Sequence, residues 1–270
     1  MPALSIVVPA RDEATNLPAL ASRIDCWMIL YGISYEIIVI DDRSEDDTVA
    51  VLEKLATWFP VRLQPKSGPQ GKGYSLLEGF GCVTAPVVCM IDADLQYPPE
   101  SIGPMAACVF DGRADIVVAS RRTLHADPIR KMASLAWKQL SRFLYGLDLD
   151  TQAGLKLIRA DILRRLVLRP SAWAIDLDLL VKAHIAGYRI ISHDIEFVPR
   201  QAGSSKLRIP AAASQILAGA IRLMLVRYGF PPPATYDLRL SAKVPSGRSA
   251  PGSLSAPDRP NPMSASPKFR

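Results

Sequence analysis

Short apolar runs and amphipathic segments alternate over the first 120 residues, and this alternation constrains the fold more than any other feature. The apolar runs, which predict strands, lie at 3–8, 35–40, 61–64, 87–91 and 115–119. The segments between them, which predict helices, lie at 15–30, 45–58, 74–80 and 99–110. Strands that alternate with helices indicate a mostly parallel sheet with helices on both faces. The sequence therefore predicts an α/β fold.

Polar residues follow four of the expected strands directly. They are Arg11–Glu13, Asp41–Asp42, Asp92 with Asp94, and Ser120–Arg122. In sheets of this kind ligands bind beyond the carboxyl ends of the strands. We therefore expect a functional site at this edge, built from both acids and arginines.

Asp92 and Asp94 are the most informative of these residues. They end an apolar run and stand two apart, so they leave the strand end as a pair of hard oxygen ligands. Such a pair suits Mg²⁺ or Mn²⁺, which takes its remaining ligands from water and substrate phosphates. Gln96 could add a carbonyl oxygen. The pattern predicts a metal–diphosphate site of the kind that a nucleotide-sugar enzyme requires.

The same motifs also occur in other classes of protein. A lone Asp-x-Asp is also common as a structural feature, and a phosphatase would place it near the first strand with a hydroxyl residue following, where this chain has Leu95 and Gln96. A dinucleotide dehydrogenase requires a glycine-rich turn after the first strand, which residues 9–13 lack. No P-loop sequence is present, and Gly71-Lys72-Gly73 taken alone indicates only a flexible loop before a helix.

Composition and charge narrow the partners and the compartment. The net charge of +6 suits an anionic partner. The four cysteines form no Cys-x-x-Cys pair, which favours reduced thiols in the cytosol, and we see no signal-peptide pattern at the N-terminus. The apolar stretch 209–230 contains Gln215, Arg222 and Arg227 and so falls short of a spanning helix. Residues 231–270 are rich in Pro, Ser and Ala and are predicted to be disordered.

Taken in order, the motifs resemble the family 2 inverting glycosyltransferases, and within them the polyprenyl-phosphate sugar synthases. The likeness covers roughly residues 3–230 and rests on the stretches 8–16, 41–48, 71–73, 92–96 and 119–121. The stretches 150–156 and 173–180 look like the dolichyl-phosphate glucosyltransferase branch, whereas 92–100 looks like the mannose synthase branch, so the sugar stays open. Arg43 departs from the family, which usually has glycine after the two aspartates.

The resemblance implies a single GT-A type domain over residues 1–230, with a mostly parallel mixed sheet flanked by helices. It implies a UDP- or GDP-hexose as donor, Mg²⁺ or Mn²⁺ as cofactor, and polyprenyl phosphate as acceptor, with inversion of the anomeric centre. No nucleic-acid partner is expected, and the oligomeric state stays open.

The resemblance also assigns roles to particular residues. The residues expected around the base, the ribose and the rest of the donor are Pro9, Arg11, Glu13, Ile40, Asp42 and Ala93. The expected metal ligands are Asp92, Asp94 and Gln96. The residues expected to clamp phosphate oxygens are Arg121, Arg130, Arg200 and Lys206, with Ser134 assisting. Asp94 and Arg121 are counted with the catalytic groups.

The acceptor decides whether a catalytic base is needed. A lipid phosphate is already an anion at neutral pH and needs orientation and charge neutralisation instead of deprotonation. A hydroxyl acceptor would need a base, for which Asp178 is the candidate, although Asp176 and Asp178 could equally cap or solvate a helix. Two alternatives therefore remain: transfer to a hydroxyl, and a catalytically inactive protein that binds nucleotide sugars.

Two basic amphipathic segments, near 130–145 and 210–230, could lie in the plane of a membrane surface. They could instead pack on the core. With a polyprenyl acceptor, the first reading predicts a peripheral protein on the cytoplasmic face of a membrane.

Overall fold

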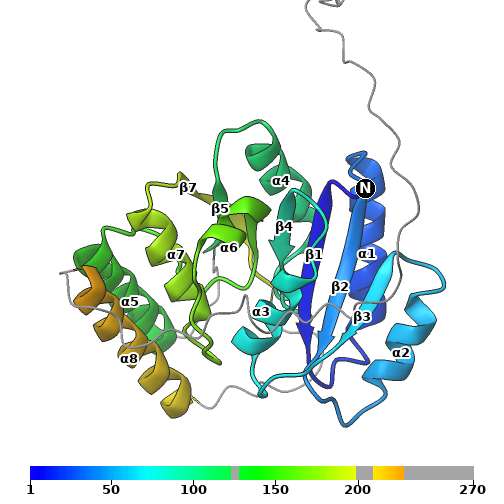
Figure 1. The fold of residues 1–270 in the computed structure, drawn as a ribbon, viewed down its shortest axis with the longest axis horizontal. Coiled ribbons are helices and arrows are strands. Elements are labelled where there is room, and N and C mark those ends of the chain that lie inside the picture. Colours follow the sequence, from blue (N-terminus) through cyan, green and yellow to red (C-terminus); the bar gives the residue numbers. More distant parts are fainter. Residues whose placement is uncertain (123–127, 199–208, 228–270) are drawn as a thin grey trace, which may run out of the picture.

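The structure of the protein is a computed structural model, which describes residues 1–122, 128–198 and 209–227. Within these residues the chain forms one mixed sheet with helices on both faces (Figure 1). The strands are β1 (Leu4–Ala10), β2 (Tyr35–Asp41), β3 (Val61–Pro65), β4 (Val87–Met90), β5 (Ile116–Arg122), β6 (Lys156–Arg159) and β7 (Ile190–Glu196). The helices are α1 (Leu17–Leu30), α2 (Thr48–Leu55), α3 (Lys72–Gly81), η1 (Pro99–Ser101), α4 (Ile102–Phe110), α5 (Pro128–Tyr145), α6 (Ala160–Arg165), α7 (Ile175–Ile185) and α8 (Ile209–Arg227).

The strand order is β3-β2-β1-β4-β6-β5-β7, and the described pairings are parallel except for those of β6. The predicted mostly parallel sheet flanked by helices is confirmed. The expected strands and helices of the first 120 residues are all present, with ends that shift by a few residues, as is usual for element boundaries.

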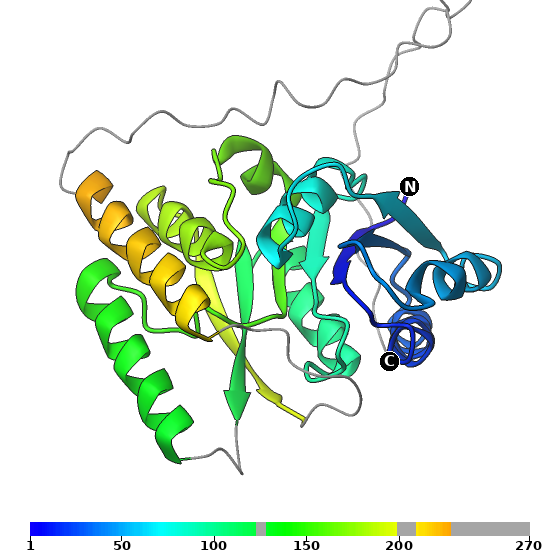
Figure 2. The same ribbon diagram turned by 90° about the horizontal axis from the view of Figure 1, so that it is seen from below.

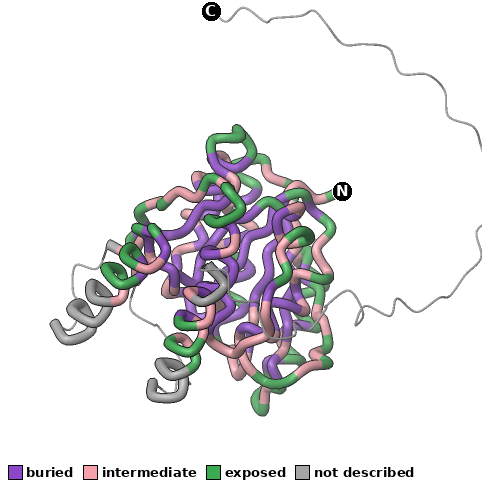
Figure 3. Tube along the Cα trace, turned by 60° about the vertical axis from the view of Figure 1, so that its left-hand side comes forward, coloured by how far each residue is buried: buried purple, intermediate pink, exposed green. Residues whose placement is uncertain are grey.

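Burial explains why the apolar runs form strands. β1 and β4 run through the middle of the molecule with nearly all of their side chains buried, as is typical of strands covered on both faces (Figure 3). Helix α1 contributes one apolar face, whereas α7 is buried over the consecutive residues 175–181. In α1 that face consists of Leu17, Leu20, Ala21, Ile24 and Met28, whose spacing matches the helical repeat.

Two strands, β6 and β7, were not predicted from the sequence, and β6 is the one that shapes the site. It runs antiparallel between β4 and β5, so that Lys156 pairs with Met90 on one side and with Val118 on the other. Because β6 runs against its neighbours, the segment that enters it lies where β4 and β5 end. Residues 150–155 are thereby brought to the edge at which the polar strand ends gather.

The two edges of the sheet differ in their left-handed residues. On the connections that lead from a helix into a strand, the residues with positive φ are all glycines: Gly32, Gly112, Gly146 and Gly187. On the loops that leave a strand, they are Gly71 and three residues with side chains, Asp12, Arg43 and Leu95, whose φ angles are 51°, 60° and 60°. Side chains adopt this conformation at a cost of about 1–2 kcal/mol each, and such strain collects at functional sites.

Helices α5 and α8 lie side by side at one end of the sheet (Figures 1 and 2). The hydroxyl of Tyr145 at the end of α5 donates to the carbonyl oxygen of Ala220 in α8 at 2.5 Å. Over the described part of the chain, no helix combines the length and the apolar character needed to cross a membrane. The predicted disordered tail, 231–270, lies outside the described residues.

Candidate active site

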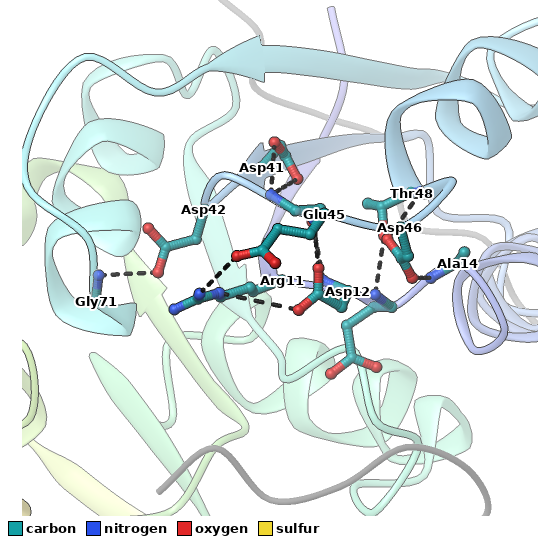
Figure 4. Close-up of polar contacts among 11 residues, drawn as sticks. Arg11, Asp12, Ala14, Asp41, Asp42, Glu45, Asp46, Thr48 and Gly71 are labelled. Atoms are coloured by element: carbon teal, nitrogen blue, oxygen red, sulfur yellow. Dashed lines mark hydrogen bonds and ion pairs between the residues drawn. The ribbon is translucent and has the colours of Figure 1, made fainter. Parts of the chain in front are cut away.

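The loops that follow β1 and β2 are joined by part-buried and exposed hydrogen bonds (Figure 4). The backbone N–H of Asp12 donates to Ser44 Oγ at 2.9 Å, and its carboxylate accepts from the backbone N–H of Glu45 at 2.6 Å. The backbone N–H of Glu13 donates to Thr48 Oγ1 at 2.9 Å. These mutual bonds hold Asp12 in its left-handed conformation and fix both strand ends as one unit.

The predicted nucleotide-pocket residues of β1 and its loop lie along this unit. Arg11 Nη2 lies 3.7 Å from Glu45 Oε1, and the carboxylate of Glu13 accepts from the side-chain amide of Asn16 at 2.6 Å. Pro9 is half-buried in β1. Their roles toward a nucleotide stay predictions.

Ile40 differs from its expected place. Its side chain has no exposed surface, and a Cβ atom added at Gly79 of α3 would come within 3.3 Å of Ile40 Cγ1. Ile40 therefore packs between the sheet and α3 and presents no side-chain surface to a ligand. Ala93 is likewise buried, at 3% exposure.

Asp42 is buried and bonded on both carboxylate oxygens. Oδ1 accepts from Lys66 Nζ at 2.5 Å. Oδ2 accepts from the backbone N–H of Gly71 at 2.8 Å (Figure 4). Lys66 is itself 1% exposed and also donates to Ser75 Oγ. Asp42 thus ties the end of β2 to the loop before α3, and its predicted contact with a ribose or base would use the remaining lone pairs.

The Gly71-Lys72-Gly73 sequence forms a packed helix start. The backbone N–H of Gly73 donates to the carbonyl oxygen of Ala172 at 3.1 Å, and a Cβ at Gly73 would lie 1.9 Å from the carbonyl oxygen of Ser171. Only glycine fits at that approach. The packing aims the side chain of Lys72 at the end of β4, where its Nζ lies 2.5 Å from Asp92 Oδ1.

The carboxylate pair stands at the end of β4, as the sequence predicts. Asp94 is 5% exposed and accepts from the backbone N–H of Gln96 at 3.2 Å. The pKa of Asp92 is raised by burial and by the charge of Asp94, against the opposing effect of Lys72. Burial acts to lower the pKa of Lys72, but the charges of Asp92 and Asp176 outweigh it and raise that pKa.

Gly154, in the segment that enters β6, lies against this pair. A Cβ at this position would come within 2.1 Å of Asp92 Oδ2 and 2.6 Å of Tyr97 Cε2. The backbone N–H of Gly154 also bonds to Tyr97, which is 4% exposed. The antiparallel strand therefore closes one side of the carboxylate pair with bare backbone.

Arg121, at the end of β5, completes this part of the edge. Its Nε donates to Asp150 Oδ2 at 2.7 Å, and its guanidinium carbon lies 5.4 Å from the centre of the Phe197 ring. Phe197 meets Tyr97 edge to face, with ring centres 5.1 Å apart. The Arg121 side chain is 30% exposed, and a guanidinium has five N–H donors, of which the bond to Asp150 uses one.

Asp176 and Asp178 begin α7 and point to different partners. Asp176 accepts from the fully buried Lys156 Nζ at 2.6 Å, and its charge acts on both Lys72 and Asp92. Asp178 accepts from Lys182 Nζ at 2.7 Å and from the backbone N–H of Arg169 at 2.8 Å. The structure thus gives Asp178 helix-start and loop contacts and puts Asp176 beside the carboxylate pair. A catalytic role for Asp178 stays a prediction that these contacts do not favour.

Sequence reasoning gave no role to Lys72, Asp150, Gly154 or Tyr97. The available signal was membership of motifs already noted, at 71–73, 92–100 and 150–156. Among the predicted phosphate-binding residues, Arg130 and Ser134 belong to α5 with side chains outside the described part, and Arg200 and Lys206 lie outside the described residues.

The residues at the end of β4 suit a divalent cation. In the described part of the chain, no group of three or more His, Cys, Asp or Glu side chains is arranged to hold a metal. Asp92 and Asp94 nevertheless offer hard oxygen ligands, and an ammonium group already stands against Asp92. Two carboxylates suit an ion that takes its other ligands from a phosphate and water.

Comparison with known proteins identifies the class. Residues 5–167 match the model of glycosyl transferase family 2, so the chain belongs to this family and is a glycosyltransferase. The resemblance drawn from the sequence motifs is confirmed.

Among the relatives are a dolichol-phosphate mannosyltransferase of Pyrococcus furiosus and a polyprenol monophosphomannose synthase of Mycolicibacterium smegmatis. Both are 28% identical to the chain, and the alignments cover 76% and 75% of it. They span 59% of the Pyrococcus protein and 80% of the Mycolicibacterium protein.

Solved structures support the fold. Glucosyl-3-phosphoglycerate synthase from Mycobacterium tuberculosis, in complex with Mn²⁺, UDP-glucose and phosphoglyceric acid, has a TM-score of 0.68 at 18% identity. The match covers 85% of this chain and 81% of that one. The fold is therefore of the GT-A type.

Proposed function

We propose that the protein transfers a hexose from a nucleoside diphosphate sugar to a polyprenyl phosphate, with inversion and with the help of Mg²⁺ or Mn²⁺. The acceptor class is supported by relatives whose names include dolichol phosphate, polyprenol or undecaprenyl phosphate. The donor and metal are supported by the presence of a divalent ion with UDP or UDP-glucose in structures of the same fold.

The observation that carries the proposal is the acidic pair at the end of β4. Asp92 and Asp94, with Gln96 nearby, would hold the cation at the edge where the loops of β1 and β2 offer a place for the nucleoside. When bound, the cation neutralises charge that develops on the departing nucleoside diphosphate. The chain's own part is to orient the diphosphate against fixed charges and to exclude water.

On the acceptor side, Arg121 supplies the orienting charge. Asp150 holds its guanidinium from one side, and the Phe197 ring packs against it. An arginine held in this way can give paired hydrogen bonds to a phosphate. A lipid phosphate needs no base, which agrees with the engagement of Asp178 by Lys182 and the Arg169 backbone.

The outer faces of α5 and α8 fit a membrane surface. The exposed fractions are 85% for Phe143, 52% for Leu217 and 50% for Ile221. Trp137 of α5 does not join them, since its indole N–H donates to Thr151 Oγ1 at 2.9 Å. Placing these side chains in the headgroup layer on the cytoplasmic face would bring the site edge to the lipid phosphate.

A transfer assay tests the proposal. The protein, residues 1–270, is incubated with UDP- and GDP-hexoses, Mg²⁺ or Mn²⁺, and short polyprenyl phosphates in vesicles, and the product is identified by mass. We expect a hexosyl polyprenyl phosphate with one donor class. Its formation should be lost when EDTA removes the metal and in the variant Asp94→Asn. Transfer only to hydroxyl acceptors, or no transfer with any donor in the presence of membranes, would reject the proposal.

A further inference from the structure

The ion pair between Lys72 and Asp92 places a positive charge where the proposed cation must bind. Lys72 Nζ lies 2.5 Å from Asp92 Oδ1, and the two side chains are 24% and 25% exposed. The ammonium group therefore occupies one coordination direction of a proposed metal ligand. A divalent ion and the Lys72 ammonium would therefore compete for the same carboxylate oxygen of Asp92.

The backbone of Lys72 is held firmly, so that only its side chain is free to respond. Lys72 is the first residue of α3, and the residue after it packs against the carbonyl oxygen of Ser171. The residue before it is bonded to Asp42 through its backbone N–H. These contacts fix the backbone of Lys72, whereas its flexible side chain can place the ammonium group in more than one position.

The surrounding charges make Lys72 necessary when no metal is bound. Asp92 interacts electrostatically with Asp94 and with Asp176, so three carboxylates share this part-buried region. The ammonium of Lys156 is bonded to Asp176, and Arg121 acts on Asp92 by its charge, whereas Lys72 forms the ion pair with Asp92. A divalent ion would take over that task and repel the ammonium. The diphosphate of the donor would then offer it new acceptor oxygens.

We propose that Lys72 is a positioning residue that neutralises Asp92 in the metal-free enzyme and moves to the donor's diphosphate when the divalent ion enters. The proposal rests on the proposed function, since it takes the diphosphate and the cation from there. Its consequence is a coupling between sites: metal and nucleoside diphosphate each strengthen the binding of the other, because each helps Lys72 to leave Asp92.

Manganese binding tests this role without any sugar transfer. The dissociation constant for Mn²⁺ is measured by electron paramagnetic resonance on wild type and Lys72→Met, first with Mn²⁺ alone. We expect the variant to bind Mn²⁺ at least about fivefold more tightly, the lower end of typical coupling between sites. The titration is repeated with UDP and with GDP, and the increase in Mn²⁺ affinity that either nucleotide brings should be at least about fivefold smaller in the variant.

Two further variants serve as controls. Lys72→Arg keeps the positive charge and should leave Mn²⁺ binding as weak as in the wild type. Lys54→Met removes an exposed lysine of α2 and should change neither titration. Circular dichroism and thermal unfolding establish that each variant is folded, since α3 begins at the substituted residue.

The inference is overturned if Lys72→Met binds Mn²⁺ no more tightly than the wild type, including the case in which neither binds it. It is equally overturned if the nucleotide strengthens Mn²⁺ binding by the same factor in both proteins. The proposed function fails on a different result, the absence of glycolipid from the wild type. The two failures are therefore distinguishable.

Discussion

Gly154 stands so close to Asp92 that a single added methyl group would meet the carboxylate oxygen at 2.1 Å. The two residues are far apart in sequence and come together because β6 runs antiparallel beside β4. The position of a proposed metal ligand is thus set by the bare backbone of another segment.

Gly154→Ala should therefore disable the site more than the fold. The methyl group would displace Asp92 and press on Tyr97, and we expect Mn²⁺ binding and hexose transfer to fall at least about tenfold, since small displacements of aligned groups are costly. Both are compared with Gly81→Ala, at a position with nothing within 4 Å. Normal Mn²⁺ binding in Gly154→Ala would show that the carboxylate pair is not the metal site.

Asp94→Asn should abolish the contribution of the cation. It keeps the size of a side chain that is 5% exposed but removes the charge. We expect transfer to fall by about a hundredfold or more, because electrostatic stabilisation of a leaving group is commonly worth that factor. Turnover is compared with that of the control variant Asp111→Asn, since Asp111 forms only an exposed ion pair with Arg113. Wild-type turnover in Asp94→Asn would remove Asp94 from the mechanism.

Arg43 occupies a left-handed position, with φ of 60°, at which the family usually has glycine. Arg43→Gly relieves strain but makes the unfolded chain more flexible, so its free energy of unfolding should stay within about 1 kcal/mol of wild type. Arg43→Val, which is β-branched, should lose about 1–2 kcal/mol. Urea denaturation measures both. A valine variant as stable as the glycine variant would contradict the left-handed backbone.

The ion pair of Lys156 and Asp176 is almost fully buried, with side-chain exposures of 0% and 7%. Lys156→Met leaves a buried carboxylate without its cation, and we expect a loss of about 3–5 kcal/mol in the free energy of unfolding. The double variant Lys156→Met/Asp176→Leu should recover most of that loss, since no uncompensated charge remains. Urea denaturation of Lys156→Met, Asp176→Leu and the double variant gives the coupling energy between the two residues. If the losses of the single variants simply add up in the double variant, the ion pair does not stabilise the fold.

Glu36 links β2 to its neighbours and gives stability a definite pH dependence. Burial acts to raise its pKa, but hydrogen bonds from Ser5, Thr84 and Arg62 lower it below the ordinary value of 4.5. A carboxyl group whose pKa is lower in the folded state stabilises the fold above its unfolded pKa. That stability is lost as the pH falls through the folded pKa.

Glu36→Gln should accordingly be about 1–2 kcal/mol less stable than wild type at pH 7. The difference should shrink steadily below about pH 4.5. The measurement is urea denaturation between pH 7 and pH 3, with the exposed Glu53→Gln as control. A difference that is the same at every pH would assign the loss to packing.

The sequence foretold the first half of the fold well, because its strands are buried on both faces and appear as plain apolar runs. Asp92 and Asp94 could be placed at a strand end for the same reason. β6 is only four residues long and runs directly into α6, so neither the strand nor its direction could be predicted. The approach of Gly154 to Asp92 depends on that direction and was out of reach.

The contacts between charged side chains also could not be predicted from the sequence. Period and spacing show which residues share a strand end, but they do not show which charges meet. Lys72 belonged to a noted motif, yet its contact with Asp92 follows from the packing of α3 on the segment before α7. The sequence offers no ground to choose between Asp176 and Asp178, and only the three-dimensional contacts distinguish the two.

The contrast between the two rims of the sheet has a practical meaning for anyone who handles this protein. Where helices return to strands, Gly32, Gly112 and Gly187 sit in open surroundings, with no atom within 4 Å of an added Cβ. A short tag or fluorescent label inserted beside Gly112 or Gly187 would thus face solvent at the edge opposite the candidate active site. Such a label could report on the protein without contacting that site.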